Sequence, residues 1–336
     1  MKIKLTSRGF NLSLFLVTVF VLTSAFGGQA PAAYAQVEQS QAAGRDPNTP
    51  VYNKASIKIT ADPSAIEAAD TNPYEGTGEL TADSGVNLKA ALGPKAMANL
   101  EAVSAPDGQE TIIGLDTRVR TYTRSYPARA TVLITFRGGR CTGWLYGPDV
   151  VATAGHCVHS GGTSGAWKTG VRVWPGYDGT VAPFGSCTAK WLASVNGWTV
   201  SASELFDYGV IKLNCTVGNT VGWYGFWWQT ASLNLLPTII SGYPGDKPFE
   251  QWLSVDQVRA TQTNQVFYSN DTIGGMSGSP VWQDRPPGSA FCSNGPCVMA
   301  IHAYGLHGAS PHDAFNHGTR IREPVFNNLI TWRNAP

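Results

Sequence analysis

Short apolar stretches separated by Gly, Pro and Asn recur along the chain from residue 130 onward. Each stretch is typical of a β-strand, and the regular spacing favours a sandwich or a barrel over a βαβ fold. We predict strands over residues 130–136, 142–146, 150–153, 171–174, 208–213, 238–242, 266–269, 280–282 and 298–302.

Two other regions have a helical pattern. Near the C-terminus, Val325, Phe326, Leu329 and Ile330 are spaced i, i+1, i+4, i+5, which predicts an amphipathic helix within residues 323–332. Short apolar runs at residues 86–92 and 96–100 also fit helices.

The first 35 residues have the pattern of a signal peptide. Lys2, Lys4 and Arg8 precede the apolar stretch 14–22, and residues 33–35 (Ala-Tyr-Ala) form a small-residue cleavage site. The alternative is a membrane anchor, but the apolar core is shorter than the roughly 20 residues that a bilayer requires. We therefore expect a secreted protein that does not remain in the membrane after signal removal.

Composition divides the rest of the chain near residue 110. Residues 36–110 contain no Trp, Phe or Cys and carry 11 acidic against 5 basic residues. Residues 111–336 contain all eleven Trp and all six Cys, and carry 16 basic against 12 acidic residues. We predict an acidic propeptide over 36–110 and one domain over 111–336; a retained, disordered linker is the alternative for the acidic part.

Three motifs in the 111–336 domain fit nucleophilic catalysis. They are Thr-Ala-Gly-His-Cys ending at Cys157, Asp207-Tyr208-Gly209, and Gly-Met-Ser-Gly-Ser-Pro beginning at Gly275. A serine hydroxyl attacks at neutral pH only when an imidazole takes its proton, and a carboxylate orients that imidazole. A Gly-x-Ser-Gly turn on its own would be compatible with a tight loop. The combination predicts a catalytic site.

From about Thr111 to the C-terminus, these motifs resemble the chymotrypsin-like serine endopeptidases, and most closely the secreted bacterial glutamyl endopeptidases. The resemblance implies an all-β fold of two six-stranded antiparallel barrels with the triad in the cleft between them. We expect the C-terminal helix, predicted from its apolar spacing, to dock on the second barrel. The resemblance makes His156 the general base, Asp207 its partner and Ser277 the nucleophile. The backbone amides of Gly275 and Ser277 would form the oxyanion hole.

Six cysteines behind a signal peptide indicate disulfides, although the sequence alone permits fifteen pairings. The resemblance singles out Cys141 with Cys157. Cys292 and Cys297 would then close a small loop and leave Cys187 to pair with Cys215. A zinc site is the competing interpretation, but paired Cys-x-x-Cys ligands are absent from the sequence.

Specificity for glutamate follows from the same resemblance. His302 matches the histidine that glutamyl endopeptidases place against the substrate carboxylate, and Thr272 matches their pocket hydroxyl. A buried glutamate side chain requires such donors. A core histidine is the alternative for His302, and a broader or different pocket is the alternative for the enzyme. Asp should be accepted less well than Glu.

The boundary at residue 110 fits self-maturation. Cleavage after Glu110 would be the enzyme's own reaction, and it would free the α-ammonium of Thr111 as an extra cation for the pocket. Met276 precedes the nucleophile, where trypsin-like zymogens have an Asp that pairs with the new N-terminus; methionine cannot form that pair. We expect Met276 to leave catalysis intact and to alter substrate contacts beside the pocket.

The remaining candidates have simpler interpretations. His159 lies in a Gly/Ser-rich loop and lacks the motif of a catalytic base, while His307, His312 and His317 are expected to be solvated loop residues rather than metal ligands. Trp223, Trp227 and Trp228 are expected to pack in the core rather than form a substrate platform.

We expect no cofactor and no metal. The expected partners are protein or peptide substrates with Glu before the scissile bond and the chain's own propeptide. The modest positive charge of the domain, without a basic run, gives no support for nucleic-acid binding. We expect a monomer. A non-catalytic binding module with the same fold is disfavoured because the sequence retains all three motifs.

Overall fold

The structure, a computed structural model, describes residues 45–80, 88–93, 97 and 110–336. The predicted signal peptide 1–35 and, apart from Met97, the predicted helical run 96–100 lie outside these residues. In the part that is described, none of the helices has the length and apolarity needed to cross a membrane.

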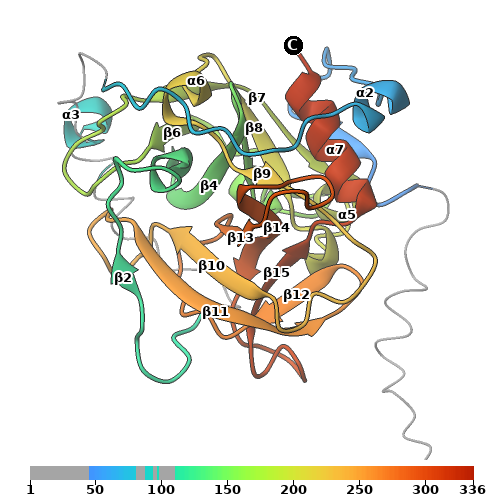
Figure 1. Cartoon of the computed structure of the whole chain (residues 1–336). Helices are drawn as coiled ribbons and strands as arrows, with labels where there is room; N and C mark the ends of the chain where they lie inside the picture. The colour runs from blue at the N-terminus through green and yellow to red at the C-terminus, as the bar shows by residue number, and fades with distance from the viewer. Residues whose placement is uncertain (1–44, 81–87, 94–96, 98–109) are drawn as a thin grey trace, which may run out of the picture. The chain divides into compact units, whose positions relative to one another are not determined.

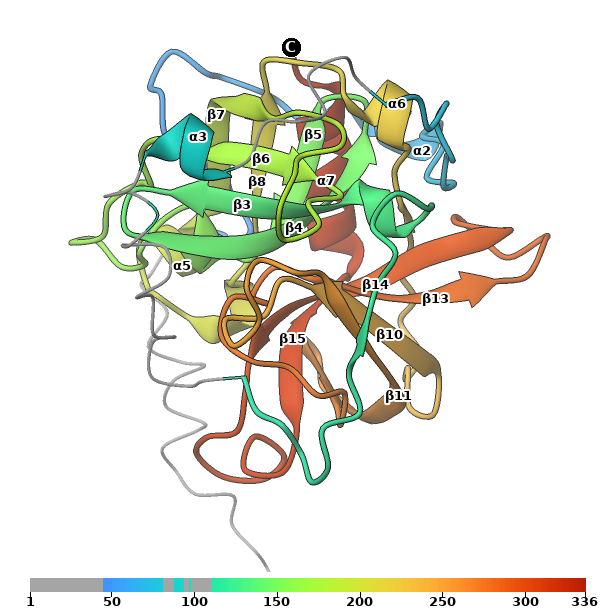
Figure 2. The same cartoon turned by 90° about the vertical axis from the view of Figure 1, so that its left-hand side faces the viewer.

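Six antiparallel strands form a first closed barrel (Figures 1 and 2). They are β3 (Thr131–Phe136), β4 (Gly139–Gly147), β5 (Val150–Thr153), β6 (Arg172–Pro175), β7 (Cys187–Val195) and β8 (Gly209–Leu213). The order is β7-β6-β3-β4-β5-β8, and pairing between β7 and β8 closes the barrel.

A second closed barrel follows the same plan. Its strands are β10 (Pro237–Gly242), β11 (Trp252–Thr261), β12 (Gln265–Tyr268), β13 (Pro280–Arg285), β14 (Gly295–Tyr304) and β15 (Asn316–Arg320). The order is β10-β13-β14-β15-β12-β11, closed by β10 with β11. Two short strands are added outside this ring: β2 (Val119–Arg120) on β11, and β9 (Gly225–Phe226) parallel to β14. The prediction of two six-stranded barrels is confirmed.

All nine predicted strands coincide with strands of the two barrels; the other three barrel strands, β7, β11 and β15, are not among the predictions. Short helical turns occupy several connections: α5 (Asn196–Thr199), α6 (Gly218–Val221), and the 3-10 turns η1 (Ala128–Ala130), η2 (Gly155–Cys157) and η3 (Glu204–Phe206). The turns η2 and η3 matter most here because they carry or precede the candidate catalytic residues.

The first barrel is apolar on both faces of its strands. Along β4, Leu145 packs with the barrel interior, while Trp144 and Tyr146 belong to a second cluster that includes Phe326 and Trp332. Successive side chains on a strand point to opposite faces, so both faces of β4 are covered. This explains why the strands of this barrel read as nearly continuous apolar runs.

The C-terminal helix α7 (Glu323–Asn334) covers one of these faces. It contacts β5 and β8, and its Arg333 carbonyl accepts a hydrogen bond from Lys212 Nζ at 3.0 Å. The predicted helix is therefore present, but its expected docking on the second barrel is wrong. Its apolar side chains pack in one cluster with Trp144 and Tyr146 of the first barrel, and Phe326 also lies against Phe226 and Phe291, each with 5.1 Å between ring centroids.

Residues 45–80 add to the outside of the first barrel. Strand β1 (Pro50–Tyr52) pairs antiparallel with β7, and Tyr74 forms an isolated bridge with Trp223. Helix α2 (Pro63–Glu67) lies beside α7. Farther along, α3 (Leu88–Leu92) falls within the predicted helical run 86–92, and Leu88 is buried.

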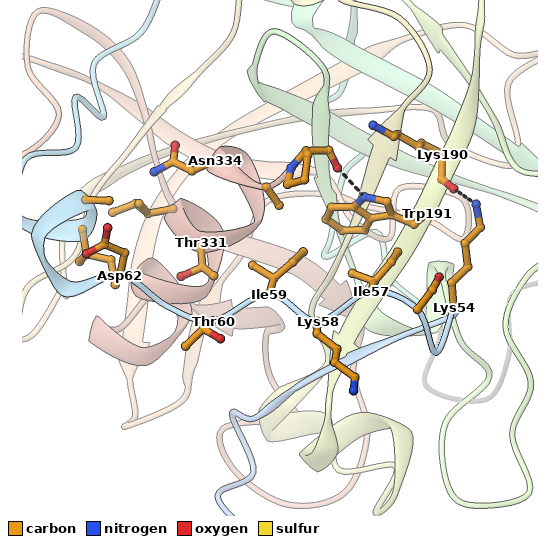
Figure 3. A pocket seen from close by; sticks show the side chains of 16 residues that line it. Lys54, Ile57, Lys58, Ile59, Thr60, Asp62, Lys190, Trp191, Thr331 and Asn334 are labelled. Carbon is orange, nitrogen blue, oxygen red and sulfur yellow. Dashed lines mark hydrogen bonds between the residues drawn. The ribbon is translucent and has the colours of Figure 1, made fainter.

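A pocket of about 750 Å³ opens between the segment 54–66 and α7 (Figure 3). Its walls include Ile57 and Ile59 on one side and Trp191 and Thr331 on the other. The lining contains none of the candidate catalytic residues. Because more than half of the lining residues come from the segment 54–66, this pocket exists only while that segment is bound.

The six cysteines form three disulfides, Cys141–Cys157, Cys187–Cys215 and Cys292–Cys297. The first joins β4 to the turn that carries His156. These are the pairs that the resemblance and the short loop favoured.

Candidate active site

His156 and Asp207 are brought together by adjacent strands. The turn η2 follows β5 and residue 207 precedes β8, and these strands pair with Thr153 opposite Gly209. His156 Nδ1 lies 2.7 Å from Asp207 Oδ2, and the His156 backbone amide donates to Asp207 Oδ1 at 2.7 Å. The buried carboxylate therefore holds both the ring and the backbone of the histidine.

Glycine is required beside this pair. A Cβ atom at Gly155 would lie 2.8 Å from Asp207 Oδ1 and 2.9 Å from the Trp198 ring. Any other residue at position 155 would displace the carboxylate or the indole, which explains the Ala-Gly-His sequence in physical terms.

Ser277 lies in the connection between β12 and β13 of the second barrel. Two glycines with left-handed backbone flank it, Gly275 at φ +103° and Gly278 at φ +88°. The Ser277 carbonyl accepts a hydrogen bond from the Thr142 amide of β4 at 2.9 Å. The serine is thus fixed across the junction of the two barrels.

The Ser277 hydroxyl is engaged by Glu110. Ser277 Oγ donates to Glu110 Oε1 at 2.5 Å, and within the described residues it makes no hydrogen bond to His156. Glu110 is only 4% exposed, and burial raises the pKa of its carboxyl, opposed by hydrogen bonds from the Ser277 side chain and backbone amide. The Glu110 carboxylate therefore occupies the space in front of Ser277, the candidate nucleophile.

His302 lies behind that carboxylate. Its Nε2 is 3.8 Å from Glu110 Oε1, and its Nδ1 is 2.7 Å from the Tyr268 hydroxyl. Burial, with the nearby His317 and His156, lowers the pKa of His302 to about 3, so the ring is neutral at neutral pH. If the Tyr268 hydroxyl donates to Nδ1, the ring carries its proton on Nε2 and offers it to a carboxylate.

Thr272 lies beside Thr111, because its backbone amide donates to the Thr111 carbonyl at 3.3 Å. The residue is fully buried, and among the described residues its hydroxyl has no hydrogen-bond partner. A buried hydroxyl that lacks a partner is costly, so Thr272 fits a position that a bound group completes.

The pKa of His156 is raised. Burial lowers it, but the Asp207 charge and hydrogen bond, together with the Glu110 charge, raise it by more. The side chain is 18% exposed and lies against Tyr304, with 5.9 Å between ring centroids. The arrangement favours an imidazolium, as a general base requires after it has taken a proton.

Thr111 is anchored at the edge of the site by Asn316. The Thr111 amide donates to Asn316 Oδ1 at 2.9 Å, and Asn316 Nδ2 donates to the Thr111 carbonyl at 2.6 Å. Asp271 continues this anchoring, since its carboxylate accepts from the amides of Ile113 and Thr117, each at 2.8 Å.

Sequence reasoning missed Asn316, Asp271 and Tyr268. Only Asp271 carried a usable signal, because it adjoins Thr272. The roles of Asn316 and Tyr268 depend on strand pairing in the second barrel, where Tyr268 lies opposite Asn316 on β15.

Met276 is fully buried in the core of the second barrel. The expectation that it alters substrate contacts is therefore wrong, because its apolar side chain turns inward while the adjacent backbone faces the site. His159, the alternative base, accepts a hydrogen bond from the Gly161 amide at 3.1 Å and packs on Trp167.

The other candidate histidines and tryptophans pack against neighbouring side chains. Trp227 is buried in the second barrel's core, Trp228 stacks on Phe291, and Trp223 lies against Tyr74. His312 and His317 are 6% and 0% exposed, so the expectation of solvated loop histidines is wrong for both. β15 carries His317 into the barrel, and the β14–β15 connection folds His312 over it.

Two groups of side chains have the composition of a metal site. Cys141, His156 and Cys157 lie together, but the two sulfurs form a disulfide and are not available as thiolate ligands. The second group contains Glu204, His312 and His317. These are the groups found among the described residues.

Comparison with known proteins assigns the family. Residues 118–312 match the trypsin family. The chain is 38% identical over 298 residues to the glutamyl endopeptidase of Bacillus licheniformis, covering 86% of this chain and 89% of that protein. It is 35% identical over 303 residues to a Bacillus subtilis protein named extracellular metalloprotease, covering 87% and 89%.

A solved structure of Glu endopeptidase in complex with MPD is similar in fold, with a TM-score of 0.58 at 29% identity. The match covers 66% of this chain and all of that one. These similarities agree with the structure, which has two closed barrels, a histidine–aspartate pair and a serine flanked by glycines with left-handed backbone. The chain belongs to the trypsin family, the chymotrypsin-like serine endopeptidases.

Proposed function

We propose that this chain is a secreted endopeptidase that hydrolyses peptide bonds after glutamate, and after aspartate less well, and that it is made as an inactive precursor. The proposed parts are a signal peptide (1–35), a propeptide (36–110) and a protease domain (111–336). The name of the Bacillus licheniformis relative supports the glutamate preference, and the word extracellular in the name of the Bacillus subtilis relative supports secretion.

One observation supports the proposed preference for glutamate. A glutamate side chain, that of Glu110, is buried between Ser277 Oγ and His302 Nε2, at 2.5 and 3.8 Å. A site that accommodates this carboxylate beside the nucleophile offers what a substrate glutamate needs, namely hydrogen-bond donors in a place that water does not fill. The Thr272 hydroxyl, which has no hydrogen-bond partner among the described residues, is a further donor for a substrate carboxylate in this proposal.

The mechanism follows from the positions of the side chains. With the site free, His156 takes the proton of Ser277 Oγ as that oxygen attacks the carbonyl after the substrate glutamate. Asp207 keeps the ring oriented through Nδ1 and stabilises the imidazolium. The backbone amides of Gly275 and Ser277 stabilise the oxyanion, His156 returns the proton to the leaving amine, and water hydrolyses the acyl-enzyme.

The precursor is inactive in this proposal because the Glu110 carboxylate holds the serine hydroxyl. Cleavage between Glu110 and Thr111 releases that carboxylate. The new α-ammonium of Thr111 stays near the pocket because Asn316 already binds the Thr111 nitrogen. It then supplies the pocket with a positive charge that neutral His302 lacks.

A peptide panel tests the specificity. Peptides that differ only in the residue before the scissile bond (Glu, Asp, Gln, Lys or Phe) are assayed with the processed enzyme, and kcat/KM should be highest for Glu. Preference for Lys or Phe would overturn the pocket assignment while leaving the serine mechanism intact.

Labelling with a fluorophosphonate tests the nucleophile. The processed enzyme should be labelled, and Ser277→Ala should not. Ser279→Ala is the matched control, because Ser279 is a buried serine two residues away. The name of the Bacillus subtilis relative suggests a metal-dependent protease as the second candidate, which would resist the label and lose activity with a chelator.

A further inference from the structure

A cluster of four side chains lies beside the catalytic aspartate and has no part in the proposed reaction. Glu204 begins η3, three residues before Asp207; His307 and His312 lie in the connection after β14; and His317 is on β15. The three imidazole rings are mutually close, with centroid separations of 4.8 to 5.1 Å.

The hydrogen bonds within this cluster leave several nitrogens unused. Within the described residues, both ring nitrogens of His317 and the Nδ1 atoms of His307 and His312 are buried without a hydrogen-bond partner. His317 Nε2 lies 3.9 Å from Glu204 Oε2, too far for a hydrogen bond. Ring stacking accounts for where the imidazoles lie, but it leaves these polar atoms unsatisfied.

A metal ion would use the same atoms. One ligand atom from each of Glu204, His312 and His317 lies within 4.8 Å of the others. A tetrahedral zinc ion with bonds of about 2.0–2.1 Å needs ligand atoms roughly 3.3 Å apart, which rotation of the partly exposed Glu204 side chain would approach. Imidazole and carboxylate ligands suit Zn²⁺ and related divalent transition metals better than Ca²⁺ or Mg²⁺.

We propose that Glu204, His312 and His317 bind one divalent transition-metal ion of the zinc class. His307 is the positioning residue, because its Nε2 contacts both carboxylate oxygens of Glu204, at 3.0 and 2.9 Å. Three protein ligands leave one coordination position for water.

The ion joins the two barrels next to the catalytic residues. Glu204 belongs to the connection that leads to β8 of the first barrel, whereas His317 belongs to β15 of the second. On that same strand, Thr319 donates its hydroxyl to the Asp207 carbonyl at 3.0 Å, and Gly318 lies opposite His302. Metal binding at this position stabilises the junction between the barrels and raises the thermal midpoint of the protein.

Cobalt titration of the secreted wild-type protein, stripped of metal by dialysis against a chelator, tests the site. Co²⁺ reports its coordination by absorption in the visible range, and we expect saturation at one ion per chain and displacement by Zn²⁺. Loss of even an outer partner typically weakens metal affinity roughly 10- to 100-fold, so removal of a ligand should weaken Zn²⁺ binding at least about 100-fold.

Three variants identify the ligands. Glu204→Gln and His312→Gln should both abolish the cobalt spectrum, and His159→Gln, which alters a histidine outside the cluster, should retain it. Glu204 is 37% exposed in its side chain, so its substitution leaves the folded protein available for measurement. Absence of saturable uptake by the wild type, or stoichiometric uptake that persists in either ligand variant, would overturn the proposal.

Discussion

Two segments that precede the protease core, residues 45–80 and 110–120, contact it in different ways. The first lies on outer surfaces: β1 pairs with β7, and the amides of Asn53 and Phe226 take part in backbone hydrogen bonds between this segment and the core. Among the described residues, it makes no hydrogen bond to His156, Asp207 or Ser277. The second enters the site, where Glu110 contacts Ser277 and Thr111 is held by Asn316.

The first segment therefore supports the fold, whereas the second blocks the candidate active site. Strand β1 extends an existing sheet edge, so its removal would change the stability of the precursor and leave the geometry of the site in place. Glu110 occupies the position in front of the nucleophile, so a single cut after it changes the site itself.

The largest expected effect is on processing. An inactive Ser277→Ala precursor, treated with processed wild-type enzyme, should be cut between Glu110 and Thr111; adding E110Q should slow that cut at least about 100-fold. A site built to hydrogen-bond a charged group strongly rejects an analogue that leaves its donors unpaired. Mass spectrometry of the new N-terminus measures the rate.

Glu79→Gln in the same inactive precursor is the matched control, because Glu79 is an exposed glutamate of the outer segment. It should be cut at the parental rate. Equal rates for the E110Q and parental forms would contradict the assignment of Glu110 to the pocket.

Thr272→Val should have the next largest effect. Loss of one hydrogen bond to a charged group costs about 1.5–3 kcal/mol, so kcat/KM for a Glu peptide should fall roughly 10- to 150-fold. A Gln peptide should be affected less, and Thr272→Ser should recover most of the activity. A uniform loss on both peptides would indicate a packing defect rather than a lost substrate contact.

The pH dependence tests whether Glu110 acts on the site electrostatically. The raised pKa of His156 means that kcat/KM is lost as the pH falls through that pKa, because only the neutral ring accepts a proton. Glu110 is one cause of the increase, so the pKa of His156 should decrease once the Glu110–Thr111 bond is cut. NMR titration of Ser277→Ala before and after cleavage measures this change.

His159 serves as an internal reference in that titration. Burial and Lys168 lower its pKa, and neither cause involves Glu110. If the pKa of His156 is the same before and after cleavage, the Glu110 carboxylate does not act electrostatically on His156, and the prediction is wrong.

The smallest effect should come from the outer segment. Tyr52→Phe removes the hydrogen bond that Trp332 Nε1 donates to the Tyr52 hydroxyl at 3.2 Å, while the ring still packs on Trp191. The free energy of unfolding of the precursor should fall by about 0.5–1.5 kcal/mol. The kcat/KM of the processed enzyme should not change; a changed kcat/KM would show that the outer segment influences the site after all.

Local patterns in the sequence were enough to predict nine of the barrel strands, the C-terminal helix and the three motifs of the candidate site. These features are local: a strand such as β5 begins with three apolar residues in a row, and the motif around Ser277 needs glycines for its left-handed backbone. The cysteine pairs and the two-barrel arrangement came from family resemblance rather than from periodicity.

The remaining features depend on contacts between residues that are distant in sequence. Strand β15 (Asn316–Arg320) is polar yet buried throughout. Partners distant in sequence bond two of its side chains: Asn316 donates to the Thr111 carbonyl, and Arg320 donates to the backbone carbonyls of Gln229 and Ala231. Such a strand has no apolar alternation to detect. The burial of His312 and His317, the docking of α7 on the first barrel and the inward turn of Met276 have the same cause: each depends on which surface a neighbouring element covers.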